Sequence, residues 1–154
     1  MTILPHFLVG SALGIVTGTP LMAFVSGFFS HFVLDLIPHL DSGTFKEDRE
    51  SVEDWPIWLY LVVIAEFILT AIIVYFIGFK RGDWSLLLWG GLGGIAVDVF
   101  ANFPIAKVST WPFFKQFYYI NHKYNSNISP KQWLVGLINQ LIVVGGALWF
   151  LLSY

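Results

Sequence analysis

Residues 6–37 read HFLVGSALGIVTGTPLMAFVSGFFSHFVLDLI, and this stretch decides the fold. Two apolar segments flank the tripeptide Gly18-Thr19-Pro20. Either the stretch is one long helix kinked at Pro20, or it is a helical hairpin that turns at the tripeptide. Each arm of such a hairpin is about 18–25 Å long, which is short for crossing a bilayer. We favour the hairpin, because the small residues of the first arm permit the close helix contact that it requires.

The composition of the whole chain is that of a membrane protein. Of its 154 residues, 56% are hydrophobic and 12% are charged, and the mean hydropathy is +0.72. Soluble domains are about 25% charged, so this chain has too few charges to cover the surface of a soluble fold. We therefore expect an integral membrane protein, with a single transmembrane domain over residues 1–154.

Three further apolar segments follow the hairpin and are predicted to be transmembrane helices. The predicted fold is all-α, a membrane helical bundle in which the hairpin is followed by spans over residues 56–79, 84–103 and 131–154. A polar loop is expected over 41–54, and an aromatic, polar segment over 105–130 with a short interfacial helix around 113–120. Four glycines in the segment 84–103 predict a face for close helix packing.

Several classes of protein and site are excluded or disfavoured. The chain has no cysteine, which excludes a thiolate nucleophile or a cysteine-based metal site. The net charge of -2 comes without a basic stripe, so no nucleic-acid partner is expected. The N-terminus lacks a basic region ahead of its apolar segment, and we expect no cleavable signal peptide.

A hairpin would gather histidine and aspartate side chains near one end of the bundle. His6 and His31 lie 12 and 13 residues from Gly18, so antiparallel arms place them side by side. A single kinked helix would separate them by most of the membrane thickness. His31 and Asp35 share one helix face because they are four residues apart, and Asp98 lies in the last turns of its predicted helix.

Imidazole and carboxylate groups together suit Zn²⁺ and related divalent ions. Charged groups inside membrane helices are costly, which favours a function for them. The predicted metal ligands are His6, His31, Asp35 and Asp98, and the predicted acid–base or second-metal residues are Asp41, His39 and His122. Lys115 and Lys123 are candidates to contact a phosphate headgroup.

Glu66 is the one acidic residue inside the segment 56–79. We expect a protonated carboxyl group that is hydrogen-bonded to Asn139 or Gln140, at similar depth in the last span. A proton-relay role is the alternative.

Three stretches resemble a known family. They are Pro5-His6 with Gly10 and Gly14, Ser30-His31-Phe-Val-Leu-Asp35, and Gly90-Gly91-Leu-Gly93-Gly94-Ile-Ala-Val-Asp98. They look like the small bacterial and archaeal inner-membrane proteins described as membrane-bound metal-dependent hydrolases, which are distantly similar to zinc-dependent phospholipase C and P1-type nucleases. The resemblance covers roughly the first 40 residues and the region 90–125. The family's His-Arg-Gly-x-Thr-His segment is lacking, and Asn121-His122-Lys123 is the nearest stretch.

The resemblance implies a divalent metal cofactor, Zn²⁺ in the family's distant relatives, and hydrolysis of a phosphoester, with a phospholipid or lipid-linked phosphate as the substrate. Two other functions remain open: a non-enzymatic scaffold or assembly subunit, in which oligomerisation is possible, and an ion or proton carrier that uses Glu66, Asp98 and the histidines.

The positive charges predict an orientation in the cell's inner, cytoplasmic membrane. The end that bears the histidines carries six lysines and arginines, and the opposite turn carries only Lys80 and Arg81. By the positive-inside rule, the histidine-bearing face is cytoplasmic.

Overall fold

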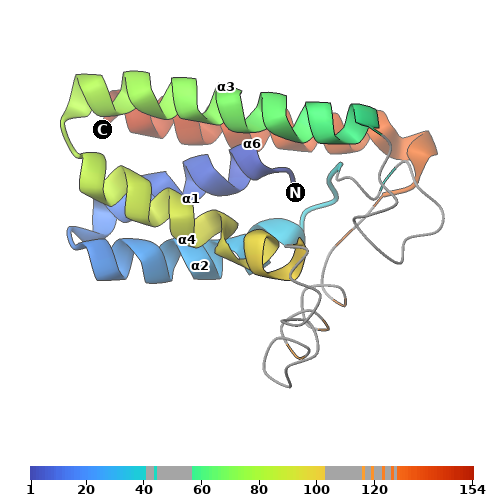
Figure 1. The fold of residues 1–154 in the computed structure, drawn as a ribbon, viewed down its shortest axis with the longest axis horizontal. Coiled ribbons are helices and arrows are strands. Elements are labelled where there is room, and N and C mark those ends of the chain that lie inside the picture. Colours follow the sequence, from blue (N-terminus) through green and yellow to red (C-terminus); the bar gives the residue numbers. More distant parts are fainter. Residues whose placement is uncertain are drawn as a thin grey trace.

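The computed structural model describes residues 1–40, 44, 57–102, 116, 119, 123, 126 and 128–154. Within these residues the fold is helical and has no β-strand, which confirms the all-α class. The elements are α1 (Ile3–Thr17), α2 (Pro20–Asp35), α3 (Ile57–Arg81), α4 (Trp84–Asn102), the 3₁₀ turn η2 (Pro130–Gln132) and α6 (Trp133–Ser153) (Figure 1). The predicted loop 41–54 and interfacial helix 113–120 lie outside the described residues, apart from single positions.

The first two helices form the expected hairpin, and the single kinked helix is wrong. Gly18 ends α1 in the left-handed region, with φ 72°, where a residue without a Cβ is favoured. Thr19 then caps α2 by accepting a hydrogen bond from the Met22 N–H at 3.4 Å. Pro20 occupies the first turn of α2, where its missing N–H has no cost. Three adjacent residues therefore stop one helix and start the next.

Glycines bring α4 into backbone contact with both arms of the hairpin. A Cβ on Gly10 of α1 would lie 2.3 Å from the Gly90 carbonyl oxygen, and one on Gly27 of α2 would lie 2.1 Å from the same oxygen. Side chains at these positions would force the helices apart. The predicted small-residue packing face of this segment is confirmed, and it sets how deeply α4 seats between α1 and α2.

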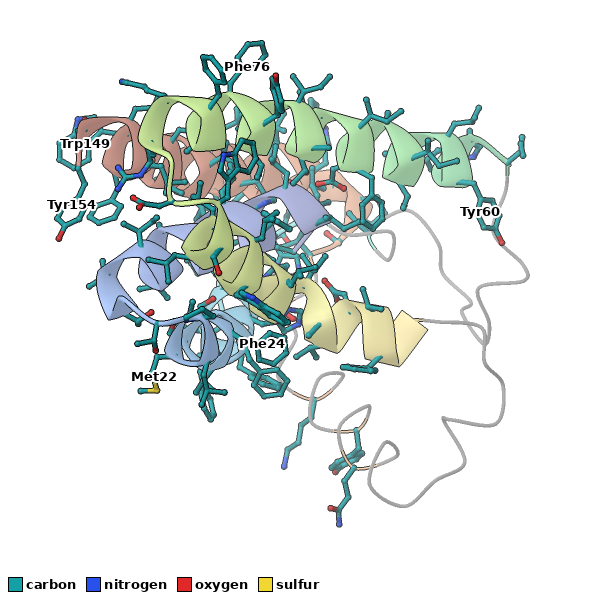
Figure 2. All side chains as sticks on the ribbon, turned by 60° about the vertical axis from the view of Figure 1, so that its left-hand side comes forward. Met22, Phe24, Tyr60, Phe76, Trp149 and Tyr154 are labelled. Atoms are coloured by element: carbon teal, nitrogen blue, oxygen red, sulfur yellow. The ribbon has the colours of Figure 1, made fainter. Side chains whose placement is uncertain are left out.

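Two helices are long and apolar enough to cross a membrane. They are the stretches Tyr60–Arg81 and Pro130–Ser153, which make up most of α3 and α6. Phe76 on α3 and Trp149 on α6 point outward, with 66% and 71% of their surface exposed (Figure 2). The apolar stretch of α4, Trp84–Phe100, is shorter, so the predicted count of spans is not confirmed for α4.

Helix α1 lies at the centre and packs against α2, α3, α4 and α6. Its N-terminal end lies beside the middle of α3 rather than beside the start of α3 (Figure 1). A hydrogen bond from the Leu4 N–H to Glu66 Oε1, 3.1 Å long, fixes this register. Glu66 lies nine residues after Ile57, or about 14 Å along the helix axis. Glu66 therefore lies beside the first turn of α1, because the hairpin packs against later turns of α3 than the first.

Candidate metal centre

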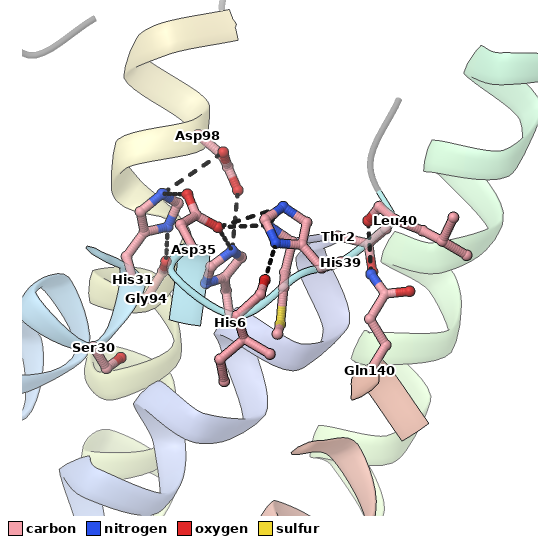
Figure 3. Close-up of polar contacts among 12 residues, drawn as sticks. Thr2, His6, Ser30, His31, Asp35, His39, Leu40, Gly94, Asp98 and Gln140 are labelled. Atoms are coloured by element: carbon pink, nitrogen blue, oxygen red, sulfur yellow. Dashed lines mark hydrogen bonds and ion pairs between the residues drawn. The ribbon is translucent and has the colours of Figure 1, made fainter. Parts of the chain in front are cut away.

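Four side chains from three helices meet at the open end of the hairpin (Figure 3). His6 comes from α1, His31 and Asp35 come from α2, and Asp98 comes from α4. The rings of His6 and His31 stack with centroids 4.1 Å apart and planes 20° apart. The antiparallel hairpin thus brings the two histidines together, as the spacing from Gly18 predicts.

Asp35 is the carboxylate closest to both histidines. Its Oδ2 atom lies 3.1 Å from His31 Nε2, and its Oδ1 atom lies 3.2 Å from His6 Nε2. The side chain of Asp35 is 2% exposed, and those of both histidines are fully buried. A buried carboxylate is costly unless it is paired, so these contacts are needed for Asp35 to remain at this position.

Asp98 completes a group that could hold a metal ion. The ligand atoms of His6, His31 and Asp98 all lie within 4.8 Å of one another. Asp98 oxygens lie 4.0 Å from His6 Nε2 and 3.9 Å from His31 Nε2. In tetrahedral Zn²⁺ sites with bonds of about 2.0 Å, neighbouring ligand atoms are about 3.3 Å apart. The distances from the histidine Nε2 atoms to the Asp35 oxygens are slightly shorter than this ligand–ligand spacing, and those to the Asp98 oxygens are somewhat longer.

The ring nitrogens of the two histidines fit the ligand role. His31 Nδ1 lies 2.9 Å from the Gly94 carbonyl oxygen, which can only accept, so Nδ1 carries the proton and Nε2 presents its lone pair to the centre. Both Nε2 atoms lie 3.1–3.2 Å from Asp35 oxygens, and within the described residues His6 Nδ1 is buried without a hydrogen-bond partner. Orphaned buried polar atoms are rare, and the two Nε2 atoms face both carboxylates, as the ligands of a shared cation would.

His39 lies at the edge of this group. Its Nδ1 donates to the Ile37 carbonyl oxygen at 2.7 Å, which leaves Nε2 as an acceptor. Nε2 lies 3.8 Å from Asp35 Oδ1 and 2.6 Å from the Met1 nitrogen. The Met1 nitrogen also lies 2.5 Å from Asp35 Oδ1. His39 is therefore adjacent to the predicted ligands but does not belong to the three-residue metal group.

Helix α6 holds the segment that carries His39. Gln140 Nε2 donates to the Leu40 carbonyl oxygen at 2.8 Å (Figure 3). Asn139 Nδ2 donates to the Pro38 carbonyl oxygen, also at 2.8 Å. A Cβ on Gly136 would lie 2.8 Å from the Leu40 nitrogen. The predicted hydrogen bond of Glu66 to Asn139 or Gln140 is therefore wrong, because both amides are engaged by residues 38–40.

Three of the remaining predicted site residues lie in parts of the chain that the structure does not describe. Asp41, His122 and Lys115 lie outside the described residues. Lys123 is described, and its ammonium lies over the Tyr119 ring, 6.0 Å from the centroid.

Two contacts of the centre were missed by sequence reasoning. The Gly94 carbonyl contact to His31 depends on the packing of α4 and has no local signal. The Glu66 contact to α1 had only a weak signal, the lack of an acidic residue in the first turn of α1, and the structure adds that the N-cap Thr2 makes no capping hydrogen bond. A helix end without its own cap needs an acceptor from elsewhere.

No family model, curated protein or solved structure matches the chain.

Proposed function

We propose that this chain is a membrane-embedded, metal-dependent hydrolase of a phosphoester. The observation that carries the proposal is the group of His6, His31 and Asp98, two buried histidines and a partly buried aspartate whose ligand atoms lie within 4.8 Å of one another. The Nε2 atoms of both histidines also lie 3.1–3.2 Å from the buried carboxylate of Asp35. The resemblance of the stretches that carry these residues to membrane-bound metal-dependent hydrolases is the reason to propose phosphoester hydrolysis in particular.

Zn²⁺ is the ion that this donor set suits best. Two imidazole nitrogens with carboxylate oxygens are a common zinc ligand set. His6, His31 and Asp98 are the assigned ligands, and Asp35 is the fourth, since it lies 3.1–3.2 Å from both imidazoles. When bound, such an ion supplies a Lewis acid that activates water and polarises a phosphoryl oxygen. The hydrogen bond from His31 to Gly94 orients the imidazole for this role.

His39 is the assigned acid–base residue among the described positions. Its Nδ1–H is held by the Ile37 carbonyl oxygen, so Nε2 is the atom that can accept and return a proton beside Asp35. Asp41 and His122 remain candidates for the same work or for a second metal ion.

The membrane location is supported by the two long apolar helices and their exposed apolar side chains. The excess of lysine and arginine at the histidine-bearing end assigns that end to the cytoplasmic side. A substrate for a site within such a bundle is a phospholipid or a lipid-linked phosphate, because its acyl chains stay in the bilayer while the phosphoester is presented to the site.

Metal analysis of the detergent-purified chain tests the proposal. We expect about one or more equivalents of a divalent ion, and loss of that ion in His31→Ala. The ion should return when zinc is added to chelated wild type. A chain with no bound ion, whose thermal stability is the same with and without chelator, would contradict the proposal and favour the scaffold.

Hydrolysis is tested separately with bis(para-nitrophenyl) phosphate and with phosphatidylglycerol in mixed micelles. We expect His39→Ala to keep the bound ion and to lose hydrolysis, because His39 is outside the metal group. Hydrolysis that proceeds equally well after chelation would argue against a metal-dependent reaction.

A further inference from the structure

The two histidines of the metal group are held in different ways. The His31 ring is fixed by its hydrogen bond to Gly94, 2.9 Å long. The His6 ring has no such backbone partner: its Nε2 lies 3.2 Å from Asp35 Oδ1, its ring stacks on His31, and within the described residues its Nδ1 has no hydrogen-bond partner. All of these ring contacts are to other members of the centre, so the place of His6 also depends on the backbone of α1 that carries it.

That backbone is held at its first turn by another helix. Leu4 is the second residue of α1, and its N–H donates to Glu66 Oε1 at 3.1 Å. The N–H groups at the second and third positions are those that an N-cap side chain normally accepts from. Thr2, the N-cap residue, makes no such bond. Its hydroxyl lies instead 3.4 Å from Gln140 Nε2 of α6. Glu66, which belongs to α3, thus caps the N-terminus of α1 in place of Thr2.

The residues around Glu66 are apolar, so placing a carboxyl group there has an energetic cost. Phe67, Ile68 and Leu69 beside it are 45–56% exposed, as lipid-facing residues of a span are. A carboxyl group in such a segment is unfavourable and calls for a specific partner. The partner that the structure gives Glu66 is the Leu4 N–H, at the positive end of the α1 helix dipole.

We propose that Glu66 is a positioning residue for the metal centre: its carboxyl group caps α1 and thereby sets the place of His6 opposite His31 and Asp98. The role rests on the proposed metal site. Capping requires an acceptor oxygen at the right distance but does not require a negative charge. Glutamine at this position should therefore cap α1, whereas leucine should not.

Cobalt binding to the whole chain in detergent tests the role, since Co²⁺ reports its ligand geometry by visible absorption. We expect Glu66→Leu to bind Co²⁺ about ten- to a hundredfold more weakly, as for other residues that orient ligands, with altered absorption bands. Glu66→Gln should restore wild-type affinity and bands. Thr70→Val is the matched control: Thr70 lies one turn on in α3 and, within the described residues, its hydroxyl donates to the Glu66 carbonyl oxygen and not to α1, so the Co²⁺ affinity of this variant should be unchanged.

Glu66→Asp covers the case in which the leucine variant does not fold. It keeps the charge but withdraws the acceptor from Leu4 by one methylene, and we expect weaker Co²⁺ binding with altered bands. Wild-type affinity and bands in Glu66→Leu, or in Glu66→Asp if the leucine variant is not folded, would overturn the positioning role. A wild-type chain that takes up no cobalt would instead show that the metal site itself is wrong.

Discussion

At the scale of single residues, the centre combines a local pair with two distant partners. His31 and Asp35 meet because they are one helical turn apart, and this contact follows from sequence spacing. His6 and Asp98 join them only through the packing of α1 and α4. The Gly94 carbonyl that orients His31 is also supplied by α4. Among the proposed ligands, the pairing of His31 with Asp35 follows from local spacing and the approach of His6 follows from the hairpin turn, whereas the approach of Asp98 depends on the packing of α4.

Asp35 is the residue whose loss we expect to affect the centre most broadly. Asp35→Asn removes the negative charge that faces His6, His31 and the Met1 nitrogen. We expect zinc affinity to fall by about tenfold or more, measured by competition with a chelating dye. Asp83→Asn is the control, because Asp83 is 47% exposed and pairs with Arg81 at the other end of α3. Equal affinities in the two variants would remove Asp35 from the ligand set.

At the scale of elements, close helix contact through glycine is what assembles the centre. Helix α4 reaches the hairpin at Gly90, whose carbonyl oxygen lies against both Gly10 and Gly27. The abundance of glycine in this segment predicts a packing face, and the structure confirms it. Which helices meet there was not predictable, since many small-residue faces are equivalent in sequence.

Adding a methyl group at this contact should separate α4 from the hairpin. A Cβ on Gly90 would lie 2.2 Å from the Gly10 carbonyl oxygen, so Gly90→Ala should lower the free energy of unfolding by about 1–3 kcal/mol. Thermal unfolding followed by circular dichroism measures this change.

Gly145→Ala is the matched control on α6. A Cβ there meets nothing within 4 Å, so the higher helix propensity of alanine should leave stability unchanged or raise it by up to about 1 kcal/mol. Similar losses in both variants would contradict the packing role of Gly90.

At the scale of the whole molecule, the hairpin packs against the two long apolar helices mainly through α1, and each of its arms is shorter than either long helix (Figure 1). Helices α3 and α6 have 25 and 21 residues, and α1 and α2 have 15 and 16. Lys80 and Arg81 at the end of α3 donate to the Leu152 and Leu151 carbonyl oxygens near the end of α6, as cations favour helix C-termini. The ends of α3 and α6 are therefore tied together on the side away from the metal group.

The orientation of the bundle can be read by cysteine labelling, because the natural chain has no cysteine. Ser129 precedes η2 at the histidine-bearing end, and Ser85 lies at the start of α4 on the opposite side; both are exposed. In intact cells we expect an impermeant maleimide to label Ser85→Cys and to spare Ser129→Cys until the membrane is opened. The reverse pattern would invert the assigned orientation.

The sequence by itself determined the helical class, the apolar composition, the turn at Gly18-Thr19-Pro20 and the pairing of His31 with Asp35. These are short-range properties, because helix formation, helix caps and i, i+4 contacts depend on residues within one or two turns. Only the tertiary structure decided that Asp98 faces the stacked histidines, that α6 holds residues 38–40, and that Glu66 caps α1 instead of binding Asn139 or Gln140. Those contacts join residues 62 to 101 positions apart, and their partners depend on how the glycine faces let the helices pack against one another.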